Sequence, residues 1–196
     1  MSASICPRYR NASLAVAYND SVKPVLTCSL LVLFCSSIAL EAQIANPMST
    51  ELKAAYNSVK NNLLKSAEKM PDENYSFKPT PDIRSFAQVL DHAASAQLHT
   101  CGAVLGEQKS GNAEATSKAE VLAALNAAFT ECDKAYDALT DANASEMIKT
   151  PRGERSRLGA LAGNVAHDNE QYGILSVYMR LKGVIPPSSE SPARAK

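Results

Sequence analysis

Three histidines and one glutamine are the residues whose types and spacing could do chemistry in this chain. His167 and Gln171 are four residues apart in the stretch "NVAHDNEQYGIL", residues 164–175. Two histidines with this spacing on one helix face can share a metal ion, and here the second position holds a glutamine. His92 and His99 are seven residues apart, which places them on one helix face but about 10 Å apart along its axis. They cannot bind one ion together, so at most one of them completes a site built around His167.

The helix that must position His167 is predicted over residues 156–182. At about 100° per residue, its apolar side chains form two adjacent seams that together cover about half of the circumference or more. His167, Asp168 and Gln171 fall within this buried arc. The residues predicted to face water are Asn169, Gly173, Ser176 and Arg180. Since an unpartnered polar group on a buried face costs about 1–3 kcal/mol, the polar side chains of this arc need a functional hypothesis.

Apolar residues at the same spacing of three and four predict three more helices, over about residues 48–70, 82–106 and 117–140. The segments between them contain Pro, Gly and polar residues, which break helices. No window alternates apolar and polar residues with period two, so no sheet is predicted. Four amphipathic helices of similar length in one domain predict an all-α four-helix bundle.

The composition limits the classes of function. The chain has 196 residues, 45% of them hydrophobic, and a formal net charge of zero, which indicates one soluble domain with a single core. Zero net charge without a basic run argues against nucleic acid as a partner, because phosphate binding needs clustered Lys and Arg. The sequence contains no Gly-rich phosphate loop and no convincing Ser–His or Cys–His nucleophile.

The N-terminal stretch differs from the rest of the chain. Residues 24–40 carry no charge, follow Lys23 and lead into small residues, as in a secretory signal that is cleaved after Ala39 or Ala42. A membrane anchor is the competing interpretation, but a span needs about 20 apolar residues and this run is short and rich in Ser and Thr. We therefore predict a signal peptide region over residues 1–42 and a secreted or periplasmic protein that has no membrane contact after signal removal.

The folded domain is predicted over residues 43–190 and is followed by a mobile C-terminal tail, residues 191–196. Cys101 and Cys132 remain after removal of the signal. In an oxidising compartment a disulfide between them would persist. Two unlinked cysteines packed in the core are the alternative.

Two segments carry a family resemblance. "YSFKPTPDIRSFAQVLDHAASAQLHTCGAVLGE", residues 75–107, and "NVAHDNEQYGILSVYMRLKGVIPPSSE", residues 164–190, resemble the DinB-like superfamily. This group includes metal-dependent enzymes related to YfiT-type hydrolases and to bacillithiol- or mycothiol-dependent transferases. The resemblance implies an up-down-down-up bundle and a divalent metal, zinc or nickel, held by three histidines. His92 and His167 match two of these ligands, and the third position falls on Gln171.

The resemblance leaves two functional hypotheses. In the first, the chain is an exported metal-dependent transferase or hydrolase that acts on an unknown small-molecule substrate, with His92, His167 and Gln171 at the metal. Asp168, Glu170 and Tyr172 are neighbours to test. In the second, it is a non-catalytic exported bundle, a binding or structural module that has lost the metal, and His167 and Gln171 are hydrogen-bonded core residues.

Two further expectations come with the family. Its members commonly form homodimers. Its second and third helices run parallel, which would bring Cys101 and Cys132 to similar heights, so that a disulfide becomes feasible beside the alternative of free thiols.

Overall fold

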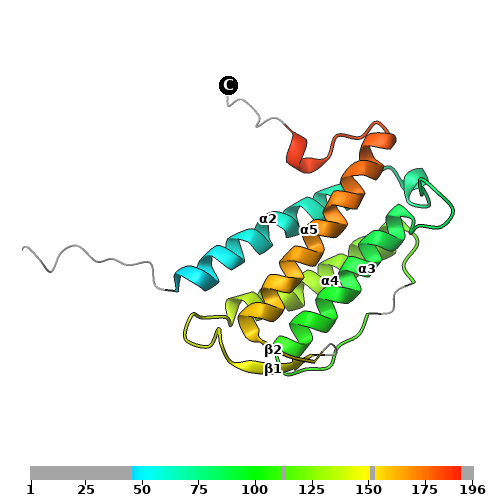
Figure 1. The fold of residues 1–196 in the computed structure, drawn as a ribbon. Coiled ribbons are helices and arrows are strands. Elements are labelled where there is room, and N and C mark those ends of the chain that lie inside the picture. The colour runs from blue at the N-terminus through cyan, green and yellow to red at the C-terminus, as the bar shows by residue number, and fades with distance from the viewer. Residues whose placement is uncertain (1–45, 112–113, 151–152, 191–196) are drawn as a thin grey trace, which may run out of the picture. The chain divides into compact units, whose positions relative to one another are not determined.

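The computed structural model describes residues 46–111, 114–150 and 153–190 (Figure 1). Residues 45–196 form one compact unit. Its helices are α2 (Pro47–Lys69), α3 (Phe86–Val104), α4 (Lys118–Asp137) and α5 (Arg157–Leu181), with 3-10 turns η2 (Asp72–Asn74) and η3 (Pro187–Ser189). The predicted signal peptide and the predicted C-terminal tail lie outside the described residues. Within the described ranges, no helix has the length and apolar character needed to cross a membrane.

Contacts at the helix ends fix the directions of α2, α3 and α5. The Tyr178 hydroxyl, near the end of α5, donates to the Arg84 carbonyl before α3 (2.9 Å), and Arg157, at the start of α5, donates to the Val104 carbonyl at the end of α3 (3.0 Å). Helices α3 and α5 are therefore antiparallel. Lys69, at the end of α2, donates to the Ile185 carbonyl just after α5 (2.7 Å), so α2 and α5 run parallel.

The segment between α3 and α4 runs back along α3. The Glu107 amide donates to the Gly102 carbonyl (2.7 Å), Gly111 packs against Ser95, and the Ala115 amide reaches the Asp91 carboxylate near the start of α3. As a result α4 starts beside the start of α3, and the two helices are parallel. The order is up-down-down-up, and the prediction of an all-α four-helix bundle is confirmed.

Serine side chains set the starts of three helices. Ser85 and Ser117 accept a hydrogen bond from the amide three residues on, and Gln88 and Glu120 bond back to them, which makes two capping boxes. Ser156 caps α5 through the Gly159 amide (3.1 Å). The cap at Ser85 explains why α3 begins at residue 86 rather than at the predicted residue 82.

The start of α2 is capped from a distant part of the chain. Its N-cap residue Asn46 has a left-handed backbone (φ 61°) and makes no side-chain cap. Instead, the Met48 and Ser49 amides donate to the Asp141 carboxylate, at 3.1 and 2.8 Å. Partial desolvation raises the pKa of Asp141, but these hydrogen bonds outweigh it and hold the pKa below its ordinary value.

Asp141 therefore gives the protein a pH-dependent contribution to stability. Because its pKa is lower in the folded chain, the contribution is complete above the unfolded-state pKa of about 3.9 and is lost as the pH falls through the folded value. We expect Asp141→Asn to lower the melting temperature at neutral pH. In acid, the difference in melting temperature between this variant and wild type should become smaller. Thermal melts at several pH values measure this. The control is Glu51→Gln, which changes an exposed acid on α2. A difference in melting temperature between wild type and Asp141→Asn that stays constant with pH would contradict the prediction.

Two strands correct the prediction that the chain has no sheet. β1 (Met147–Thr150) and β2 (Gly153–Ser156) pair antiparallel, with Ile148 opposite Arg155. Each strand has only four residues, too few to show a period of two. One prediction of a water-facing residue also changes: Ser176 is buried, since the buried arc of α5 is wider than counted.

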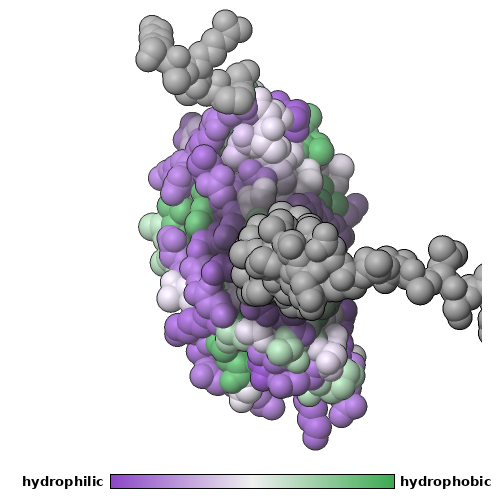
Figure 2. Space-filling view, turned by 90° about the vertical axis from the view of Figure 1, so that its left-hand side faces the viewer, coloured by the Kyte–Doolittle hydropathy of each residue, from purple (hydrophilic) through white to green (hydrophobic). Residues whose placement is uncertain are grey.

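Few large apolar side chains are exposed in the part of the chain that the structure describes. They are Met48, Ile83, Met147, Val177, Leu181 and Ile185. The face shown in Figure 2 is mostly hydrophilic, and its apolar residues lie in small separate patches. Val177 and Leu181 are one helical turn apart on α5, followed by Ile185.

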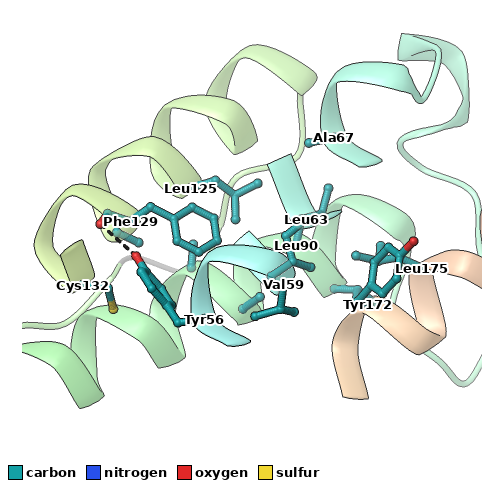
Figure 3. Close-up of a cluster of buried hydrophobic side chains, with 14 of the residues drawn as sticks. Tyr56, Val59, Leu63, Ala67, Leu90, Leu125, Phe129, Cys132, Tyr172 and Leu175 are labelled. Carbon is teal, nitrogen blue, oxygen red and sulfur yellow. Dashed lines mark hydrogen bonds between the residues drawn. The ribbon is translucent and has the colours of Figure 1, made fainter. Parts of the chain in front are cut away.

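The core lies between the four helices, and Tyr56 belongs to the part of it drawn in Figure 3. Tyr56 stacks on Tyr136, with ring centroids 3.8 Å apart, and its hydroxyl donates to Asp133 (2.8 Å). Cys101 and Cys132 form a disulfide between α3 and α4, with Cα atoms 5.0 Å apart. The parallel direction of these helices makes the bond feasible, and the structure thus decides between the two alternatives left open by the sequence.

Candidate metal centre

His92 on α3 and His167 on α5 face each other across the bundle. Their Nε2 atoms are 3.1 Å apart and the rings are tilted by 68°. This distance fits a hydrogen bond between two neutral imidazoles. It also fits two ligands of one ion, because Zn–N bonds of about 2.0–2.1 Å at a tetrahedral angle place the nitrogens about 3.3 Å apart. The separation of the two ring nitrogens is therefore compatible with either arrangement.

Behind His167 lies a cluster of buried polar side chains. Asp168 is fully buried, and its Oδ1 is 3.7 Å from His167 Nδ1. Asn164 donates to Gln97 Oε1 (3.1 Å), and the Tyr136 hydroxyl donates to the Leu161 carbonyl (2.9 Å). Burial raises the pKa of Asp168, and the neighbouring His167 opposes this rise.

Sequence reasoning missed Asn164 and Gln97 as members of this cluster. The signal was present for Asn164, because Asn164, Asp168 and Gln171 follow one another at i, i+4 and i+7 on one face of α5. Gln97 gave no signal of its own, since its role depends on the helix opposite. Among the described residues, five buried atoms of the cluster make no hydrogen bond: Gln97 Nε2, Asn164 Oδ1, His167 Nδ1, Asp168 Oδ1 and Gln171 Oε1.

Gln171 lies one turn beyond His167 and is buried, with 4% of its surface exposed. Its unpartnered Oε1 is an available donor atom for a cation, although an amide oxygen is a weaker ligand than imidazole or carboxylate. Glu170 is exposed, and the Tyr172 hydroxyl is occupied with Ser188 (2.7 Å). Of the neighbours singled out from the sequence, only Asp168 lies at the histidine pair.

A pocket of about 360 Å³ opens beside the histidine pair, between α3, α5 and the β1–β2 hairpin. His99 and Asn164 belong to its wall, as do Thr150 and Arg155 from the hairpin. Nothing in the sequence analysis singled out the hairpin as part of a site. The volume is at the small end of the range for ligand sites, which suits a small molecule rather than a macromolecule.

The available ligand atoms fit a divalent cation, with a lower affinity than three histidines would give. Two imidazole nitrogens have a suitable separation, and Gln171 Oε1, one turn further along α5, makes no hydrogen bond with the described residues. In the part of the chain that the structure describes, no group of three His, Cys, Asp or Glu side chains could hold a metal. His99 lies two turns from His92 and does not replace the missing ligand.

The fold and the site define a four-helix bundle with a pocket between α3 and α5. The family model of the DinB superfamily matches residues 55–175. The chain belongs to the DinB superfamily. A search of curated proteins gives no match.

Solved structures share the fold, among them two DinB-like proteins. A DinB-like protein from Bacillus cereus is 17% identical, with a TM-score of 0.59, over 69% of this chain and 93% of that one. A DinB-like protein from Bacillus subtilis is 16% identical, with a TM-score of 0.55, over 68% of this chain and 92% of that one. At these identities the likeness shows the fold alone.

Proposed function

We propose that this protein is a metal-dependent enzyme, a transferase or hydrolase that acts on a small molecule bound in the pocket beside His92 and His167. The observation that carries the proposal is the 3.1 Å separation of the two Nε2 atoms at the pocket wall. These nitrogens would hold a divalent cation, zinc or nickel, with Gln171 Oε1 as a weaker third ligand. Such an ion polarises a substrate or activates a thiol or water.

The chain's own residues would prepare this site. The buried carboxylate of Asp168 lies on the Nδ1 side of His167, where it favours the tautomer that has its proton on Nδ1. This leaves the Nε2 lone pair directed at His92, which is the usual arrangement of a histidine ligand with a carboxylate behind it. The walls from α3, α5 and the hairpin would limit the water around the reacting group.

The second candidate is a binding or structural module without a metal. It is favoured by one observation, that the described residues offer no third His, Cys, Asp or Glu donor. In that case the His92–His167 contact is a hydrogen bond, and the pocket binds its ligand without reaction.

Metal content separates the two candidates. We expect the tag-free protein to carry zinc or nickel, and His167→Ala to lower its affinity for the metal by more than the roughly 10–100-fold that loss of an outer-shell partner costs. Gln171→His should raise the affinity, because imidazole is the better donor. Elemental analysis and competition with a chelator measure both effects.

The matched control is His99→Ala, which removes the third histidine of the chain, also at the pocket wall but two turns from His92. This variant should keep its metal. An empty wild type together with a metal-loaded Gln171→His variant would contradict the enzyme proposal and favour the module.

We also propose that the protein is exported, and we expect the homodimer that the family resemblance implies. The uncharged stretch of residues 24–40 supports export, as does the Cys101–Cys132 disulfide, because such bonds persist in oxidising compartments. Sequencing of the mature N-terminus should find a start after Ala39 or Ala42, and a mature chain that retains residues 1–39 would contradict export. Light scattering would test association, and a monomer mass would contradict the dimer.

A further inference from the structure

The side chain of Arg155 belongs to the inner face of the β1–β2 hairpin. Residues directly opposite in an antiparallel pair have their side chains on the same face, and Arg155 is opposite Ile148. Ile148 packs against the core, so this face is turned towards the helices. Arg155 accordingly lines the same pocket as His92 and His167.

Two contacts place the guanidinium group of Arg155 against α5. Its Nη2 donates to the Gly159 carbonyl (2.8 Å). One turn further on, Gly163 leaves room for it, because a Cβ at this position would be 3.0 Å from Nη1 and 3.3 Å from Nη2. The group is thus supported along one side by the helix, and its remaining N–H donors are available to a ligand.

The charge of Arg155 has no counter-ion in the described part of the chain. Arg157, two residues later, pairs with Glu146 (2.8 Å), whereas no carboxylate of the described residues forms an ion pair with Arg155. Among the described residues that line the pocket there is no Asp or Glu, and Arg155 is the one that carries a fixed charge.

A second pocket of about 790 Å³ adjoins the first, since both have His99 and Thr150 in their walls. Two of the three cations that line it are already paired, because Lys109 contacts Glu107 and Glu131, and Arg157 contacts Glu146. The second pocket therefore adds little positive charge, and the case for an anionic ligand rests on Arg155 in the first pocket.

We propose that Arg155 is the anion-binding residue of the pocket, and that the ligand is a small molecule with a carboxylate group. The flat guanidinium matches a carboxylate with two parallel hydrogen bonds. The rest of the molecule then extends along the wall towards His92 and His167. This deepens the proposed function and rests on it for what happens at the histidines, but the anion site itself needs no metal.

The test compares succinate with succinamide, its neutral analogue of the same shape, by calorimetry and NMR at fixed ionic strength. Chelator-treated protein is used first and metal-loaded protein second. We expect wild type to bind succinate more tightly than succinamide in both forms. Arg155→Ala should weaken succinate binding by about tenfold or more, and Arg155→Lys by less, because the charge remains but the paired geometry is lost.

Gly163→Ala provides a variant that keeps the charge. The added methyl displaces the flexible guanidinium, so succinate binding should weaken, while the helix itself gains from replacement of glycine. Gly173→Ala is the matched control on the same helix. No atom lies within 4 Å of a Cβ at Gly173, so this variant should gain helix stability and bind succinate as wild type does.

Each outcome decides between the two proposals. Equal binding of succinate and succinamide, no binding by wild type, or full binding by Arg155→Ala overturns the anion site. If succinate binds only to metal-loaded protein and Arg155→Ala has no effect, the anion belongs to the metal centre, and the proposed function stands without this inference. If binding needs Arg155 but the protein holds no metal, the anion site stands and the enzyme proposal fails.

Discussion

Replacing Tyr56 with alanine is expected to lower the free energy of unfolding by about 3–5 kcal/mol, the range for a large buried aromatic side chain. Tyr56 is fully buried, stacks on Tyr136 and packs near Phe129, with ring centroids 6.2 Å apart (Figure 3). The surrounding helices can close only part of the space that its ring would leave. Urea denaturation followed by circular dichroism measures the change.

Tyr56→Phe is the matched control, because it keeps the ring and removes only the hydroxyl. This hydroxyl donates to Asp133 (2.8 Å), and burial raises its pKa, so it stays protonated as a donor at neutral pH. The control should cost about 1 kcal/mol. If Tyr56→Ala costs no more than Tyr56→Phe, the ring is not the main support of this part of the core.

Removal of the disulfide is expected to cause the second large loss of stability. Cys101 and Cys132 are separated by 31 residues along the chain. In the chain-entropy account, a link that closes a loop of this length lowers the entropy of the unfolded chain and stabilises the fold by roughly 3–4 kcal/mol. We expect Cys101→Ala with Cys132→Ala to lower the melting temperature by roughly 10 °C, given about 2–4 °C per kcal/mol for a domain of this size.

The control for this double variant is the wild type melted in the presence of a reductant. Both cysteines are fully buried, so the bond should resist reduction in the native state and open once the chain unfolds. The reduced wild type should then melt close to the double variant. A double variant that melts at the wild-type temperature would show that the link adds nothing to stability.

The helices could be predicted because each has a continuous apolar stripe, and α5 shows why this works. Its wide buried arc placed Asp168 and Gln171 on the inner face, where the structure has them. The direction of the helices did not follow from this periodicity. The up-down-down-up order came from the family resemblance, since the spacing within a helix carries no information on which neighbour it meets.

The parts of the candidate site that were missed depend on contacts between elements. The sequence around Arg155 does not show that a short hairpin turns this side chain towards α5. Strands of four residues are too short to show a clear alternation of apolar and polar residues. Gln97 was equally hidden, since its polar side chain becomes part of the site only when Asn164 lies opposite. The choice of His92 over His99 came from the resemblance, and the structure places His92 beside His167. Whether these residues hold a metal stays a prediction.

The return of the chain along α3 has a consequence for the rate of folding. Because α3 and α4 are parallel, no short hairpin joins them, and the disulfide between them links residues 31 apart. Other contacts between the helices join residues still further apart, 93 for Met48 and Asp141 and 75 for His92 and His167. Loop closure must precede such contacts, so a high contact order slows folding. This domain should therefore fold more slowly than an up-and-down bundle of equal length, in which each helix packs against the helix that precedes it in the sequence.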